Sequence, residues 1–126
     1  MRPPILIVED NEVNMRLFSD LLGALGYVVY QAEDAETALE LLKSVRPGAI
    51  VMDIQLPGMS GEECTRAIKA DPDLSEIPVI AVTAFAMAGD EARFLDAGCD
   101  GYMSKPINVP LFAETIARHY QGEPTN

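Results

Sequence analysis

Residues 49–61, AIVMDIQLPGMSG, join a stretch suited to a protein interior to a single charge. Residues 49–52 are all apolar, which is typical of a strand that a parallel sheet buries on both faces. Asp53 follows them directly, and the pair Pro57-Gly58 then marks a turn. Whether this carboxylate is an isolated charge or part of a site depends on which residues end the other strands.

Outward from this stretch, the chain alternates between apolar strands and amphipathic helices. Asn11, Asp34 and Ser60 are helix-capping residues, and Gly26 is a usual helix stop. The other strands are expected at residues 5–8, 27–32, 79–84 and 101–104, and the helices at about 13–25, 34–45, 60–69, 88–97 and 108–119. Such alternation implies right-handed βαβ units. The sequence therefore predicts an α/β fold, with a five-stranded parallel sheet and five helices on its two faces.

Size and composition indicate one soluble domain. The chain has 126 residues, 48% of them hydrophobic, and no apolar run approaches the length that crosses a membrane. No linker or repeat is evident, so residues 1–126 are expected to be a single domain with a core at about 4–120 and a frayed tail at 121–126. No signal peptide is evident, and Cys64 and Cys99 lie far apart in the sequence. These features predict a cytoplasmic protein with reduced cysteines.

The charge balance narrows the range of partners. The formal net charge is −11, and the sequence pI is about 4.3. A nucleic-acid surface needs a basic patch that displaces counterions, and an acidic chain argues against one. We therefore expect neither nucleic-acid binding nor membrane insertion.

Polar residues follow four of the five expected strands. Glu9 and Asp10 come after the first strand, Asp53 ends the third, Thr83 lies at the end of the fourth, and Lys105 follows the fifth. In an open α/β sheet, ligands bind outside the carboxyl ends of the strands. Because these residues share one edge of the sheet although they are far apart in the sequence, we expect them to form one site, with Asp53 at its floor.

The residue types in this site suit phosphoryl chemistry. Carboxylates that converge on one pocket repel each other by roughly 4 kcal/mol at 4 Å and an effective dielectric of 20. A cation relieves that repulsion, and oxygen ligands favour Mg²⁺, with Mn²⁺ as the alternative. A carboxylate is also a nucleophile toward phosphorus, and Asp53 is the most central candidate, with Glu9 and Asp10 as metal holders. Lys105 and the Thr83 hydroxyl suit phosphoryl oxygens.

The segments ILIVEDN (5–11), VMDIQLPGMSG (51–61), VIAVTA (79–84) and YMSKP (102–106) together resemble the receiver domains of bacterial two-component response regulators. The resemblance covers about residues 4–120, and it is particularly to a single-domain member that acts in cell division. It implies a flavodoxin-like fold with strand order 2-1-3-4-5. It also implies that a histidine kinase or histidine phosphotransferase passes a phosphoryl group to the protein.

The resemblance assigns the chemistry to particular residues. Asp53 matches the phosphoacceptor and Lys105 the phosphate-binding lysine. Asp10 would ligate Mg²⁺ together with Asp53 and the backbone carbonyl of Gln55, while Glu9 would act largely through water.

The resemblance also implies a conformational switch. Thr83 matches the switch hydroxyl, and Tyr102 matches the aromatic residue that moves inward with it. Separately, the Lys105–Pro106 bond matches one that is cis in the family and helps to aim the lysine. Gln55 and Phe85 occupy the positions that flank the hydrolytic water. Because Phe85 offers that water no hydrogen bond, slow self-dephosphorylation is expected. The resemblance to a phosphoacceptor domain also implies that the protein is not an enzyme and has no activity on a separate substrate.

The readout implied by the resemblance is a protein contact. The downstream target would bind the face made by the fourth helix, the fifth strand and the fifth helix, here residues 86–104 and 108–119. Of the apolar residues on this face, Phe94, Leu95, Phe112 and Ile116 have helical spacing and are expected to be mostly core, whereas Met87 and Tyr102 are candidates for exposure.

Several other interpretations remain at this point. A haloacid-dehalogenase-type phosphatase would carry a second Asp where this chain has Gln55, and a flavodoxin-like FMN carrier would have a phosphate-cradling loop in place of EDNEVN (9–14). A pseudo-receiver that works without phosphorylation is disfavoured because every key position is filled. A receiver excised from a longer regulator is the remaining alternative, because no output domain follows the last helix.

Overall fold

The computed structural model describes residues 3–84 and 90–121, and in them five strands alternate with five helices. The strands are β1 (Ile5–Val8), β2 (Val29–Ala32), β3 (Ala49–Asp53), β4 (Val79–Thr83) and β5 (Gly101–Ser104). The helices are α1 (Glu12–Ala24), α2 (Ala35–Leu41), α3 (Gly61–Ala70), α4 (Asp90–Ala97) and α5 (Val109–His119). The predicted α/β class is confirmed.

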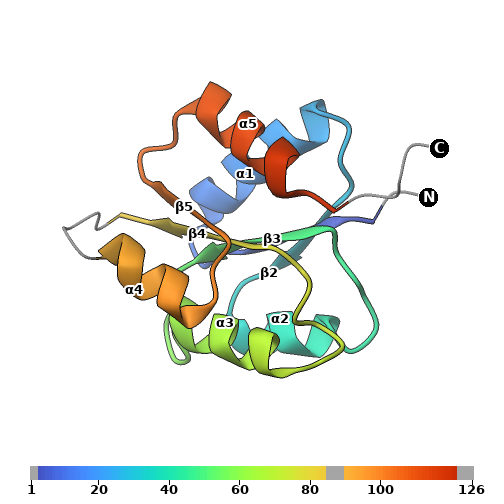
Figure 1. The fold of residues 1–126 in the computed structure, drawn as a ribbon. Coiled ribbons are helices and arrows are strands. Elements are labelled where there is room, and N and C mark those ends of the chain that lie inside the picture. The colour runs from blue at the N-terminus through green and yellow to red at the C-terminus, as the bar shows by residue number, and fades with distance from the viewer. Residues whose placement is uncertain (1–2, 85–89, 122–126) are drawn as a thin grey trace.

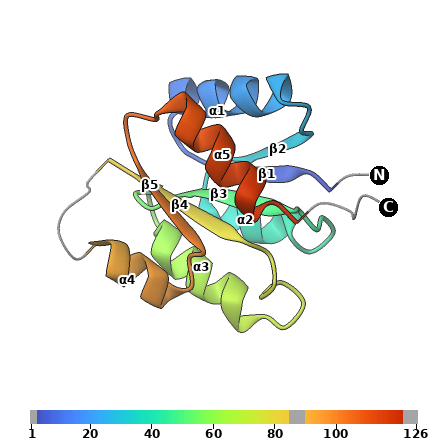
Figure 2. The ribbon, with the colours of Figure 1, turned by 45° about the horizontal axis from the view of Figure 1, so that its top comes forward.

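All five strands belong to one parallel sheet in the order β2-β1-β3-β4-β5, as predicted. Helices α1 and α5 cover one face of the sheet, and α2, α3 and α4 cover the other (Figure 1). The tilted view in Figure 2 shows that α1 and α5 lie side by side. The strands run from right to left in Figure 1, so their carboxyl ends share the left edge of the molecule.

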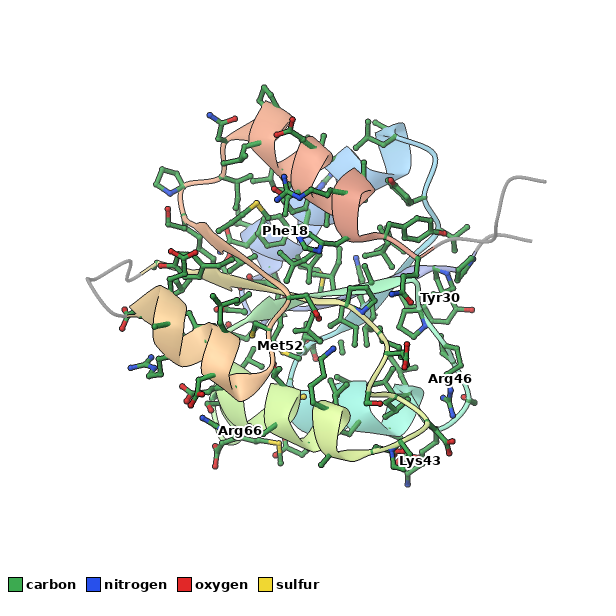
Figure 3. The ribbon with its side chains drawn as sticks, in the orientation of Figure 1. Phe18, Tyr30, Lys43, Arg46, Met52 and Arg66 are labelled. Carbon is green, nitrogen blue, oxygen red and sulfur yellow. The ribbon has the colours of Figure 1, made fainter. Side chains whose placement is uncertain are left out.

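Each face of the sheet has its own hydrophobic core. Phe18 belongs to the core under α1 and α5, where its ring stacks on Phe112 at a centroid distance of 5.5 Å. Met52 belongs to the core on the opposite face (Figure 3). Every residue of β1, β3 and β4 is buried, which is why these strands are apolar without alternation. Cys64 and Cys99 are free thiols in the core.

Helices α1, α2, α3 and α5 begin within one residue of their predicted starts, and the predicted start of α4 at residue 88 lies outside the described residues. The side chains of Asn11, Asp34, Ser60 and Asn108 each accept a hydrogen bond from a backbone N–H of the first helical turn. The helices run from 7 residues in α2 to 13 in α1. Among the helices of the described residues, none has the length and hydropathy that a membrane crossing requires.

Two predicted boundaries are wrong, whereas the prediction that Phe94, Leu95, Phe112 and Ile116 are mostly core is confirmed by three of the four. The second strand begins at Val29 instead of residue 27, and α2 ends at Leu41, where turns replace its predicted last residues. Val13 on α1 is 76% exposed, and Leu95 on α4 is 47% exposed, although both fit an apolar helical stripe. Helical spacing assigns a residue to one side of a helix, but the neighbouring elements decide how much of that side is covered. Met87 lies outside the described residues.

The first and the last described residues lie together at the amino edge of the sheet, opposite the carboxyl edge (Figure 1). The Tyr120 hydroxyl donates a hydrogen bond to the carbonyl of Pro3. The Gly48 backbone bonds to residues near both chain ends. Its N–H donates to the carbonyl of Pro4 at 2.8 Å, and its carbonyl accepts from the N–H of Gln121 at 2.9 Å. These bonds tie α5 and the start of β1 to the loop before β3.

Register brings the polar strand ends together. Val8 pairs with Met52, so the next residues, Glu9 and Asp53, lie side by side at the carboxyl edge. Thr83 pairs with Ser104, which places Lys105 just beyond the same edge.

The start of α3 is pressed against the end of β3. A Cβ atom at Gly61 would lie 2.1 Å from the carbonyl oxygen of Asp53 and 2.8 Å from the Cα of Ile54. Both of these are backbone atoms of the segment that carries Asp53, so neither can rotate away. Only glycine permits this close approach.

We therefore predict that Gly61→Ala destabilises the protein by about 1–3 kcal/mol, because the added methyl has to displace backbone. Gly23→Ala in α1 is the matched control. A Cβ there meets nothing within 4 Å, so alanine should stabilise that helix by about 0.5–1 kcal/mol. Urea unfolding of both variants measures the difference, and a Gly61→Ala protein as stable as the wild type would contradict the prediction.

Candidate functional site

Three carboxylates gather at the carboxyl edge of the sheet. Glu9, Asp10 and Asp53 each offer an oxygen atom, and these atoms all lie within 4.8 Å of one another. Glu9 is 1% exposed and Asp53 is 3% exposed, whereas Asp10 is exposed to solvent. The predicted acidic cluster therefore forms, with two of its members taken out of water and one at its surface.

Glu9 bears most of the electrostatic cost. Its Oε1 atom is buried and has no hydrogen-bond partner among the described residues. Burial and then the charge of Asp53 raise the pKa of Glu9 to about 7. The N–H of Asn11, 3.2 Å from Glu9 Oε2, and the charge of Lys105 lower that pKa but do not offset the increase. Lys105 and the Asn11 N–H therefore offset only part of the cost of burying the Glu9 charge.

Lys105 is the cation that the fold brings to this cluster. Its Nζ lies 3.3 Å from Glu9 Oε1 and 3.6 Å from Asp53 Oδ2. Its backbone N–H donates to the carbonyl of Thr83 at 2.8 Å, which joins the end of β5 to the end of β4. The Lys105–Pro106 peptide bond is cis. Lys105 lies between two carboxylates, so a phosphoryl group attached to either of them would have a positive charge close to its oxygens.

The loop after β3 contacts Asp53 and the end of β4. The backbone N–H of Gln55 donates to Asp53 Oδ1 at 3.0 Å. The side-chain oxygen of Gln55 accepts a hydrogen bond from the N–H of Ala84 at 3.2 Å. Thr83, the residue before Ala84, is buried at 1% exposure. Gln55 thus bridges the two strand ends that carry Asp53 and Thr83.

The donor set fits a divalent cation with hard oxygen ligands. Carboxylate oxygens are the ligands that Mg²⁺ and Mn²⁺ prefer, and Mg²⁺ commonly binds through one or two of them and keeps several waters. Such a charge relieves the mutual repulsion of the three groups, and it offers a ligand position to Glu9 Oε1, a buried oxygen that accepts no hydrogen bond from the described residues and has only the ion pair with Lys105. Each pair of charges at about this separation costs roughly 3–4 kcal/mol at an effective dielectric of 20.

A cleft of about 550 Å³ opens beside the carboxylates. It lies between α1, the end of β2 and the start of α2, and its lining is mostly polar and acidic. Glu9 and Asp10 belong to the lining, so the cleft gives a hydrated cation access to this pair from the side of α1.

Tyr102, another predicted residue, lies outside this cluster. Tyr102 is half-buried on β5, with its ring 5.5 Å from that of Phe94, and burial together with the charges of Asp90 and Glu91 raises its pKa. It belongs to the α4 side of the molecule and not to the group of carboxylates. Phe85 lies outside the described residues.

The fold and this edge define a class of protein. The chain belongs to the response regulator receiver domain family, whose pattern matches residues 5–117. Domains of this family are signalling domains and not enzymes that act on a separate substrate. The chain is 53% identical over 123 residues to the polar-differentiation response regulator DivK of Brucella anthropi, a match that covers 98% of this chain and 99% of that protein. The DivK protein of Brucella ovis is 52% identical over the same shares.

Solved structures agree with this assignment. The receiver domain of a signal transduction histidine kinase from Syntrophus aciditrophicus has a TM-score of 0.85 and 32% identity, over 92% of this chain and 88% of that one. The receiver domain of a sensor histidine kinase from Pseudomonas aeruginosa has a TM-score of 0.86 and 35% identity, over 94% and 98%. That structure has a magnesium ion coordinated in its active-site cleft.

Sequence reasoning missed two contacts. The bridge from the Gln55 side chain to Ala84 has no sequence signal, because it depends on a rotamer and on the spacing of two loops. The hydrogen bond from the Asn11 N–H to the Glu9 carboxylate has no sequence signal either, because the sequence identifies Asn11 only as a helix cap.

The raised pKa of Glu9 predicts a pH-dependent stability. An unfolded glutamate releases its proton near its ordinary pKa, while the folded protein holds it until about pH 7. The stability due to this proton is therefore complete below about pH 4.5 and is lost as the pH rises through about 7, by roughly 3 kcal/mol. Glu9→Gln removes the titration, so its stability relative to the wild type should increase from pH 5 to pH 8.

Urea unfolding at several pH values, with divalent cations chelated, measures this difference. A relative stability of Glu9→Gln that is constant or decreases over this interval would show that Glu9 titrates normally.

Proposed function

We propose that Asp53 is the phosphoacceptor of a phosphorelay and receives its phosphoryl group from a phosphohistidine on a histidine kinase or histidine phosphotransferase. The observation that supports this role is the environment of Asp53: a buried carboxylate at the end of β3, with Lys105 Nζ 3.6 Å from one of its oxygens and two further carboxylates within 4.8 Å. In the transfer, an Asp53 oxygen bonds to phosphorus while the phosphorus–nitrogen bond breaks. The imidazole leaves with that electron pair and takes up a proton.

The proposed metal holders are Asp10 and Asp53, the backbone carbonyl of Gln55, and Glu9 acting through water. Mg²⁺, or Mn²⁺ in its place, supplies charge neutralisation and orients the phosphoryl oxygens when it is bound. Lys105 holds one phosphoryl oxygen and exchanges its contact with Glu9 for it. The Thr83 hydroxyl donates to another oxygen.

We infer that the signal is a population shift. Moving a two-state switch from 1:99 to 99:1 takes about 5.5 kcal/mol of differential stabilisation. The new charge-assisted bonds from the phosphoryl group to Thr83 and Lys105 are each worth about 1.5–3 kcal/mol, which is of the size required. Tyr102, next to Phe94, follows the movement of Thr83.

The proposed output surface is the face formed by α4, β5 and α5. Leu95 is 47% exposed on α4 and Tyr102 is half-buried on β5, so both offer surface to a target protein on this face. On the other side of α4, Arg93 pairs with Glu62 of α3 at 3.2 Å, which fixes α4 against its neighbour. The names of the Brucella relatives support a role in polar differentiation. We propose that the protein acts in this process or in cell division, and that it does so in the cytoplasm.

The donor has to reach Asp53 from the carboxyl edge. Val13 and Leu17 of α1 are 76% and 40% exposed, and Leu111 at the start of α5 is 48% exposed. Since α1 and α5 lie side by side, these residues give a protein donor apolar contacts near the site (Figure 2).

We predict that the protein incubated with acetyl phosphate and Mg²⁺ gains one phosphoryl group by intact mass. Asp53→Asn should gain none, because its amide is not a nucleophile, and EDTA should prevent the gain in the wild type. Asp96→Asn, an exposed carboxylate on α4, is the control and should be phosphorylated normally.

A wild type that takes up no phosphoryl group from acetyl phosphate, nor from a cognate phosphohistidine protein, would refute the proposal and favour a receiver that works without phosphorylation. Phosphorylation that persists in Asp53→Asn would place the acceptor elsewhere.

The phosphorylated protein should lose its phosphoryl group slowly, over minutes or longer, because Phe85 offers the attacking water no hydrogen bond. Phe85→Glu adds an acceptor that orients the water, so we predict several-fold faster loss. Phe85→Leu remains apolar and should keep the wild-type lifetime. Phosphate release after removal of the donor measures all three, and equal lifetimes for wild type and Phe85→Glu would contradict the prediction.

A further inference from the structure

The contacts around Asp53 form a closed ring. Gln55 donates its backbone N–H to Asp53 Oδ1 at 3.0 Å and accepts the N–H of Ala84 on its side-chain oxygen at 3.2 Å. Ala84 follows Thr83, whose carbonyl accepts the N–H of Lys105 at 2.8 Å. The Nζ of Lys105 then returns to Asp53 Oδ2 at 3.6 Å. The ends of β3, β4 and β5 are connected through it.

The Gln55 side chain is the weak link of this ring. It accepts a hydrogen bond of 3.2 Å between two uncharged groups, whereas Lys105 and Asp53 attract each other as ions. The other uncharged link, from the Lys105 N–H to the Thr83 carbonyl, is shorter at 2.8 Å and joins the backbones of two paired strands. Charge-assisted bonds are roughly twice as strong as neutral ones. Gln55 is also only half-buried, so its amide can turn toward water when it is displaced.

A phosphoryl group on Asp53 would compete with the Gln55 side-chain oxygen for the hydrogen-bond donors near it. It adds a charge of about −1.5 to −2 and three acceptor oxygens, directly beside the loop that carries Gln55. Those oxygens accept hydrogen bonds more strongly than an amide carbonyl does. The N–H of Ala84 has one hydrogen, and Gln55 holds it in this structure.

We propose that the Gln55 side chain is a latch, which holds the N–H of Ala84 in the unphosphorylated protein and releases it when Asp53 carries a phosphoryl group. This inference rests on the proposed function. Gln55 acts through Ala84 and is therefore a positioning residue for the end of β4. Breaking the Gln55–Ala84 hydrogen bond costs free energy, and this cost makes the phosphorylated state less favourable. A protein that lacks this bond therefore binds a phosphoryl group or its analogue more tightly.

Binding of beryllofluoride, an analogue of the phosphoryl group, in buffer with Mg²⁺ tests the latch without hydrolysis. Gln55→Met keeps the length of the side chain and loses the oxygen, and Gln55→Asn keeps the amide but is one methylene too short. Both should bind beryllofluoride about fivefold more tightly than the wild type, the equivalent of one net hydrogen bond.

Hydrogen exchange of the Ala84 amide, followed by NMR, reports the latch directly. In the free protein, exchange should be faster in Gln55→Met and Gln55→Asn than in the wild type. Gln55→Glu restores an acceptor at the original length and should restore slow exchange. If Gln55 had a merely structural role, its replacement would weaken beryllofluoride binding instead of strengthening it.

The outcomes separate this inference from the proposed function. A wild type that binds no beryllofluoride would refute phosphorylation at Asp53. A wild type that binds it, with variants that bind equally or more weakly although their Ala84 amide exchanges faster, would overturn the latch alone. Unchanged exchange at Ala84 in both variants would overturn it as well.

Discussion

Two carboxylates from adjacent strands, Glu9 and Asp53, are buried side by side, and this repulsion is the constraint on which the rest of the site depends. The register of β1 and β3 places them together, so they cannot separate without breaking the centre of the sheet. Lys105 compensates part of the repulsion, and the raised pKa of Glu9 shows that the compensation is incomplete. Added positive charge at this edge would relieve the remaining repulsion, and this is the physical basis of the phosphoryl transfer proposed above.

Much of the fold could be predicted because the interior strands carry an unambiguous pattern. Every position of β1, β3 and β4 is buried, so an unbroken apolar run marks each of them. The edge strand β2 is only partly buried, and its weaker pattern is why its start was placed two residues too early. Val13 and Leu95 show the converse limit, since an apolar residue at helical spacing stays exposed where no element covers it.

The candidate site could be located for a similar reason. Parallel strands bring their carboxyl ends to one edge, so residues that follow the strands converge whatever their separation in the sequence. What the sequence could not indicate was how the cluster divides between buried Glu9 and exposed Asp10, which depends on the path of the first loop. It also could not indicate the Gln55–Ala84 bridge, which depends on side-chain torsions. These two features determine the charge balance and the connection between strand ends.

The position of the chain ends has a practical consequence. Tyr120 and Gly48 hold the first and the last described residues at the amino edge of the sheet, opposite the carboxyl edge where β3 ends (Figure 1). A tag, a fluorescent reporter or a sensor surface attached at either end therefore leaves the carboxyl edge facing free solution. Donor proteins and small phosphodonors can be compared on one immobilised sample, because the tether obstructs neither of them.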